Sequence, residues 1–314
     1  MDIRFERGFD QIGSGDMDLY SQMTGQLRND AQEFQSAAWL IRDGIGLAQS
    51  IDDFLDIHRS NAHLNLYGKA AIVKAILEAE RGSKLYFDRN SGSEFDATRL
   101  ADTWFVKFTH MLSRGIPREN VSEIFDRVSF VNFNYDRCVE HFLGNALQKL
   151  HGIREDRALS IVNDLNIIHP YGVVAKTTPF GATRANYREL AGGLKTYTEQ
   201  LGEEDVIHGI ANEVRRAECI VFLGFAYHRQ NMQTLAPQAA MFSKPVFGTA
   251  YGMSDADVEV TSHQLDAWFE ASVTHGVGVR RNFKVGARPN IKLENKLTSA
   301  ALFDNYARSL SGGD

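Results

Sequence analysis

Two asparagines and an aspartate follow a short apolar run in the segment Ser129 to Arg137, where they alternate with aromatic residues. A strand that ends in polar side chains before a helix is how open α/β sheets build ligand sites at their carboxyl edge. Asn134 could orient a water molecule or a ribose hydroxyl, and Asp136 could accept a hydrogen bond from an amide. The structural alternative is that Asn134 turns the chain and Asp136 caps the following helix.

A histidine stands in the same kind of position after the apolar pair Ile167 and Ile168. His169 is a candidate general base, since histidine titrates close to neutral pH. Pro170 and Gly172 predict a tight turn that brings the backbone close to a ligand. A structural histidine that bonds a backbone carbonyl is the alternative.

A third polar end follows the apolar run 219–223, which is the clearest strand pattern in the chain. Gly224 comes directly after it, and a glycine there lets a phosphate or ribose approach the backbone. The alternative is a tight turn in which Phe225 and Tyr227 are core aromatic residues. His228 ends this segment and is grouped with it as a candidate binding residue.

Periodicity predicts the elements that position these residues. Apolar residues recur at helical spacing over 37–57, 66–85 and 98–112, with Ser50 as the predicted N-cap of a helix that has Asp52 and Asp53 in its first turn. After residue 128 short strands alternate with helices, which predicts a parallel sheet with 219–223 as a central strand. The predicted strands are 128–133, 167–168, 219–223, 245–248 and 291–293. The predicted helices between and after them are 135–150, 186–201, 205–218, 232–242, 255–270 and 298–310.

The bulk properties exclude several classes of function. The net charge of −6 gives no global basic surface for nucleic acid, and Arg280 with Arg281 is interpreted as a solvated turn. No run of apolar residues is long enough for a membrane span, and the N-terminus lacks a signal-peptide core. Cys138 and Cys219 are the two cysteines, too few for a disulfide framework or a four-cysteine zinc site. We therefore expect a cytoplasmic protein without zinc.

Taken in order, the three polar strand ends resemble those of the bacterial sirtuin-like family, NAD-consuming relatives of sirtuin deacylases that act in antiphage defence. Phe133 to Arg137 is the most specific part, and Ser50 to Leu55 is also similar to a segment of that family. The resemblance implies one sirtuin-like domain over 1–314, with a mostly helical module over 1–127. It implies a Rossmann-like α/β core over 128–314, with a parallel sheet and helices on both faces.

The resemblance also implies an activity, which is cleavage of the bond between nicotinamide and ribose in NAD. Asn134 matches the asparagine that positions water and ribose, Asp136 the aspartate that holds the carboxamide, and His169 the histidine that acts on the ribose hydroxyls. Gly224 and Phe225 match the loop near the adenosine ribose and phosphate. The other residues implied to line the NAD site are Asn132, Tyr171, Gly172 and His228. The trigger is expected to come from a sensor or activator protein, or from homo-oligomerisation.

Two departures from the family pattern leave alternatives open. Sirtuin-like domains begin with an apolar strand that runs into a Gly-rich phosphate loop, whereas Gly13-Ser14-Gly15 follows a polar stretch. Either that strand lies upstream of Met1, or the protein is an inactive sirtuin-like module that binds a nucleotide or a protein. Many relatives also have a histidine directly before the glycine, where this chain has Tyr171, so either His169 or Tyr171 acts on the ribose.

Overall fold

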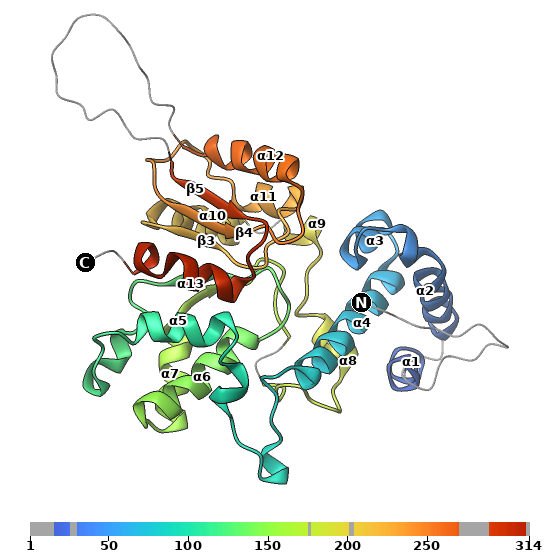
Figure 1. The fold of residues 1–314 in the computed structure, drawn as a ribbon. Coiled ribbons are helices and arrows are strands. Elements are labelled where there is room, and N and C mark those ends of the chain that lie inside the picture. Colours follow the sequence, from blue (N-terminus) through green and yellow to red (C-terminus); the bar gives the residue numbers. More distant parts are fainter. Residues whose placement is uncertain (1–15, 26–29, 175–176, 201–203, 270–288, 312–314) are drawn as a thin grey trace, which may run out of the picture. The chain divides into compact units, whose positions relative to one another are not determined.

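The structure is a computed structural model of the 314-residue chain, and it describes residues 16–25, 30–174, 177–200, 204–269 and 289–311. The chain is of mixed α/β class and forms two compact units, each built from two separate stretches of sequence (Figure 1). The first unit comprises Met1–Asp96 and Phe130–Glu203. The second comprises Ala97–Ser129 and Glu204–Asp314. Each unit therefore combines residues from the helical first third with residues from the later α/β part.

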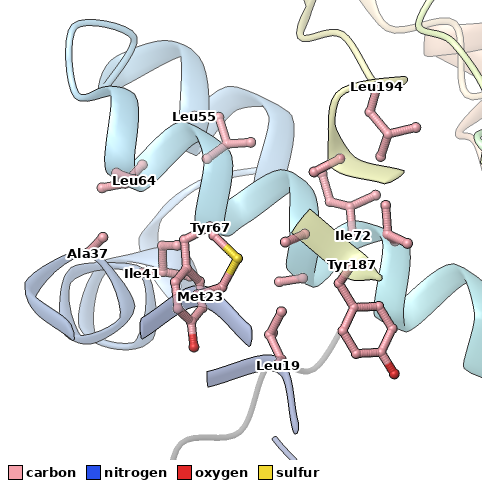
Figure 2. Packing of buried hydrophobic residues seen from close by; sticks show 14 of the residues in the cluster. Leu19, Met23, Ala37, Ile41, Leu55, Leu64, Tyr67, Ile72, Tyr187 and Leu194 are labelled. Atoms are coloured by element: carbon pink, nitrogen blue, oxygen red, sulfur yellow. The ribbon is translucent and has the colours of Figure 1, made fainter. Parts of the chain in front are cut away.

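The helical part of the first unit is built around one long helix. This helix, α4, lies beside four shorter ones (Figure 1). Their bounds are α1 (Met17–Thr24), α2 (Ala31–Gly44), α3 (Ile51–Ile57), α4 (Ala62–Gly82) and α8 (Tyr187–Ala191). Figure 2 shows that apolar side chains from these helices meet in one cluster, which includes Tyr67, Met23 and Ile41. The short elements η1 (Ile45–Leu47), η2 (Arg89–Ser91) and α9 (Tyr197–Gln200) also belong to this unit.

Side-chain caps and a close approach fix the junction between α3 and α4. The side chain of Ser50 accepts from the Asp53 N–H at 3.1 Å, so the predicted N-cap is confirmed. Asn61 caps α4 in the same way through the Leu64 N–H at 3.0 Å. A Cβ atom on Gly68 would lie 2.4 Å from a methyl carbon of Leu55, so a glycine at this position lets α3 and α4 pack closely.

The first unit also contains a two-stranded sheet with two helices between its strands. The order along the chain is β1 (Ser129–Val131), α6 (Cys138–His151), α7 (Glu155–Asp164) and β2 (Asn166–Ile168). Both strands end where they were predicted to end, within two residues. Helix α7 was not predicted, because only a narrow apolar stripe interrupts its polar sequence. Helix α6 begins three residues later than predicted, because the chain bends at residues 134–136.

The second unit holds a parallel sheet of three described strands, β3 (Ile220–Phe222), β4 (Val246–Thr249) and β5 (Ile291–Glu294), in that order. The parallel pairing is as predicted, but the prediction that 219–223 is the central strand was wrong. The central strand is β4, of which all four residues are buried. Among the described residues β3 pairs with β4 alone, and Val221 on it is 37 % exposed. A continuous apolar run therefore did not distinguish an edge strand from a central one.

Two predicted helices are shorter than expected for local reasons. The expected helix over 232–242 is α11 (Arg229–Leu235), which ends before Pro237, since a proline disfavours the helical conformation of the residue preceding it. The expected helix over 186–201 is divided into α8 and α9 by Gly192 and Gly193. The other described helices of the second unit are η3 (Ala97–Leu100), α5 (Trp104–Leu112), η4 (Arg118–Glu123), α10 (Glu204–Arg216), α12 (Asp255–Asp266) and α13 (Ser299–Leu310).

Aromatic packing joins α5 to α13 in the second unit. The ring centroid of Trp104 lies 6.3 Å from that of Phe303, and the ring of Phe108 lies 5.9 Å from Phe303. Such contacts stabilise a helix pair beyond the burial of apolar area alone. Across the described part of both units, no helix is long and apolar enough to span a bilayer.

Candidate functional site

The ends of β1 and β2 bring the predicted Asn and His residues together. The Asn132 N–H donates to the Ile168 carbonyl at 2.8 Å, so pairing continues to the carboxyl ends of both strands. Asn134 and His169 follow these ends, and His169 Nδ1 lies 3.3 Å from the Asn134 carbonyl oxygen. The Asn132 side chain accepts from the Asn134 N–H at 3.1 Å, which stabilises the turn and leaves Asn134 exposed.

The second nitrogen of His169 contacts a carboxylate that sequence reasoning did not find. His169 Nε2 lies 3.0 Å from Glu140 Oε1, and the two side chains are only 9 % and 15 % exposed. Glu140 lies in the first turn of α6, four residues after Asp136. That spacing is the signal that could have identified it, because a residue in the first turn of a helix lies close to the strand end that precedes it.

Asp136 lies one residue before the N-cap of α6, which is Arg137 and has no side-chain cap bond, so the structural alternative is right only in that Asp136 binds the start of the helix. Asp136 Oδ1 accepts from the Cys138 N–H at 2.9 Å. Burial, and next the charge of Asp136, raise the pKa of the Cys138 thiol. The thiol therefore stays protonated at neutral pH and is a poor nucleophile. The carboxamide-binding role of Asp136 stays a prediction.

Tyr135 connects the site to the segment Ser50 to Leu55. Its hydroxyl donates to Asp52 Oδ1 at 2.6 Å and lies 3.1 Å from the Lys195 carbonyl oxygen. Burial raises the pKa of Tyr135, and it also raises the pKa of Asp52, although the hydrogen bond from Tyr135 opposes the latter shift. Two segments that the resemblance had singled out separately therefore meet in a buried contact between residues 83 positions apart.

The structure places Tyr171 in an aromatic cluster. Its ring is buried and lies 5.8 Å from that of Phe133 and 6.4 Å from that of Tyr135, measured between centroids. The next residue, Gly172, has a φ of +79°, and a Cβ atom there would lie 2.0 Å from the Gly193 carbonyl oxygen. The predicted tight turn is thus confirmed, and only glycine fits it.

A buried ion pair anchors the beginning of α6. Arg137 Nη2 lies 2.6 Å from Glu80 Oε2, and the exposed fractions of the two side chains are 7 % and 1 %. Glu80 also accepts from the Gly181 N–H at 2.9 Å, and the Arg137 guanidinium donates to the Thr178 carbonyl. The pair therefore connects α4, the start of α6 and residues 178–181. Sequence reasoning gave Arg137 no such role, because its partner lies 57 residues away.

His141, next to Glu140, is a structural histidine. Its ring stacks on Phe180 with 3.9 Å between centroids, and its Nε2 lies 3.3 Å from the Leu85 carbonyl oxygen. Burial lowers the pKa of His141 from 6.5 to about 4. The folded state therefore holds this ring neutral at pH values at which an unfolded chain would protonate it.

We expect this histidine to make stability depend on pH. Between pH 6.5 and pH 4 the unfolded chain binds a proton at His141 that the folded chain does not bind, so stability falls as the pH is lowered through this range. From pH 7 to pH 5 the loss from this group is about 2 kcal/mol. Urea denaturation of the wild type and of His141→Phe at both pH values measures it. Equal pH dependence in the two proteins would contradict this assignment.

The remaining predicted residues lie in the second unit, after β3. Gly224 has a φ of +58°, and its N–H donates to Thr249 Oγ1 at 2.8 Å. Tyr227 is buried, as the structural alternative predicted, and its hydroxyl donates to the Thr249 carbonyl at 3.2 Å. Phe225 packs 5.2 Å from Tyr227, between ring centroids, and His228 is exposed directly before α11. These residues form a loop over the end of β4, and their binding role stays a prediction.

Two segments that the sequence analysis considered lie outside the described residues, namely Gly13-Ser14-Gly15 and Arg280-Arg281. Within the ranges that the structure describes, no group of three or more His, Cys, Asp or Glu side chains is arranged to hold a metal ion.

No family model, curated protein or solved structure matches this chain.

Proposed function

We propose that this chain is a sirtuin-like NAD glycohydrolase, which cleaves NAD to ADP-ribose and nicotinamide and acts in bacterial antiphage defence. The observation that carries the proposal is the pair of strand ends in the first unit. There His169 Nδ1 lies 3.3 Å from the backbone carbonyl oxygen of the exposed Asn134, so the two residues are neighbours at the strand ends. These are the two residues that the resemblance assigns to the reaction.

The reaction fits an amide and an imidazole. Departure of nicotinamide leaves an oxocarbenium-like ribose, as in glycoside cleavage, and water completes the hydrolysis. Asn134 would position the water and the ribose, since its side chain is exposed at the end of β1. His169 would act on the ribose hydroxyls from the neighbouring strand end. In this proposal the fold is Rossmann-like, and the Gly224 loop is a nucleotide-binding loop.

A second candidate is an inactive sirtuin-like module that binds a nucleotide or a protein. The observation in its favour is that Tyr171, which stands where many relatives have histidine, is buried in the aromatic cluster. One carboxylate oxygen of Asp136 is also engaged by the N-terminus of α6. Both features are consistent with a site that still binds a ligand but lacks groups that catalysis needs.

Calorimetry combined with a turnover assay distinguishes the two candidates. ADP-ribose and NAD are titrated into the purified protein, and nicotinamide is quantified in the same samples. Binding of both ligands with release of nicotinamide supports the hydrolase. Binding without release favours the inactive module, and the absence of binding at millimolar ligand would contradict both the hydrolase and a nucleotide-binding module.

A further inference from the structure

We propose that Glu140 is a positioning residue for His169, which it holds in one ring orientation at the ends of β1 and β2. The kinetic part of this inference rests on the proposed function, whereas the positioning itself does not. The observation behind it is the 3.0 Å contact between Glu140 Oε1 and His169 Nε2, on the opposite side of the ring from the Asn134 carbonyl.

The imidazole is held through Nε2. An ionised carboxylate only accepts hydrogen bonds, so the proton of the Glu140 contact lies on His169 Nε2. This places Nδ1 toward the Asn134 carbonyl oxygen, at 3.3 Å. Rotation of the ring about the Cβ–Cγ bond would break the Glu140 contact. The contact is also well shielded from water, since the two side chains are 9 % and 15 % exposed.

The helix that carries Glu140 is itself firmly anchored. Asp136 Oδ1 accepts from the N–H of Cys138, its first residue, and the backbone N–H of Arg137 donates to Glu80 Oε1 at 3.3 Å. The carboxylate of Glu140 is therefore presented from a rigid element, which is the arrangement that holds a reactive side chain in a productive orientation. A carboxylate that orients a histidine through its second nitrogen is a recurrent device in enzyme sites.

NMR of the full chain with labelled histidine nitrogens tests the positioning without any substrate. We expect one ring N–H resonance, protected from exchange with solvent, that disappears in His169→Asn and in Glu140→Met. Methionine keeps the size and helix propensity of glutamate and lacks an acceptor oxygen. Retention of this resonance in Glu140→Met, or its absence from the wild type, would overturn the proposal.

Steady-state kinetics with NAD test the consequence. Glu140→Met is expected to lower kcat by about 10- to 100-fold with little change in KM, as for other carboxylates that orient a histidine. Glu140→Gln, whose amide oxygen still accepts, should recover most of this loss, and Glu94→Gln on an exposed carboxylate of the same unit should behave as wild type. Wild-type kcat in Glu140→Met would overturn the proposal. If the wild type does not cleave NAD, the proposed function fails and the NMR experiment still decides the role of Glu140.

Discussion

Glu80→Gln is expected to lower the free energy of unfolding by about 3 to 5 kcal/mol, because it leaves the Arg137 guanidinium buried without its counter-charge. In the wild type the carboxylate of Glu80 contacts Arg137 Nε and Nη2 at 3.1 Å and 2.6 Å, and it also accepts from the Gly181 N–H. Glutamine keeps the size of the side chain, so the loss measures the charge and the hydrogen bonds rather than a cavity. Urea denaturation gives the value.

The same substitution at an exposed ion pair is the matched control. Glu94 Oε2 lies 2.6 Å from Lys149 Nζ, the same distance as in the buried pair, and both residues belong to the first unit. Their side chains are 77 % and 51 % exposed, and exposed pairs contribute at most about 1 kcal/mol. Glu94→Gln should therefore leave stability nearly unchanged. Equal losses at the two positions would contradict the argument that burial makes the Glu80 contact important.

His169→Ala is expected to lower kcat for NAD cleavage by about 10²- to 10⁴-fold, the range for loss of a group that takes part in proton transfer. Tyr171→Phe should cost much less. The mutant phenylalanine keeps the ring that packs on Phe133 and Tyr135 and removes only a hydroxyl. The comparison decides which of the two residues acts on the ribose.

The opposite order of the two effects would overturn this assignment. If Tyr171→Phe stopped turnover and His169→Ala did not, the residue directly before Gly172 would be the reactive one. Thermal denaturation of both variants accompanies the kinetics, so that a loss of activity can be compared with any loss of fold. His169 is less than one-tenth exposed and takes part in the contact with Glu140, so a modest drop in stability is expected for His169→Ala.

Local patterns predicted much of this structure. The N-cap at Ser50, the strand ends before Asn134 and His169, and the parallel pairing of the 219–223 strand with its neighbour followed from periodicity and residue type. Capping and strand-end signals depend on a few adjacent residues, and these can be read directly from the chain. The proximity of Asn134 to His169 also followed, because the ends of paired strands lie next to each other.

The parts that escaped prediction depend on contacts between distant residues. Glu80 and Arg137 are 57 positions apart, and nothing near either residue indicates its partner. The edge position of β3 depends on which strands pair, and an apolar run contains no such information. The role of Tyr135 as a donor to Asp52 required that two segments fold against each other. Glu140 is the exception, since its place in the first turn after the strand end was available locally.

The central claim is most directly tested by nicotinamide release from NAD, measured by chromatography with purified wild type and Asn134→Ala, each with and without a candidate activating partner. We expect nicotinamide release by the wild type and loss of release in Asn134→Ala. The thermal stability of Asn134→Ala should be unchanged, because Asn134 is exposed and its substitution changes the buried apolar area very little. Nicotinamide release that persists unchanged in Asn134→Ala, or intact NAD with the activated wild type, would contradict the account.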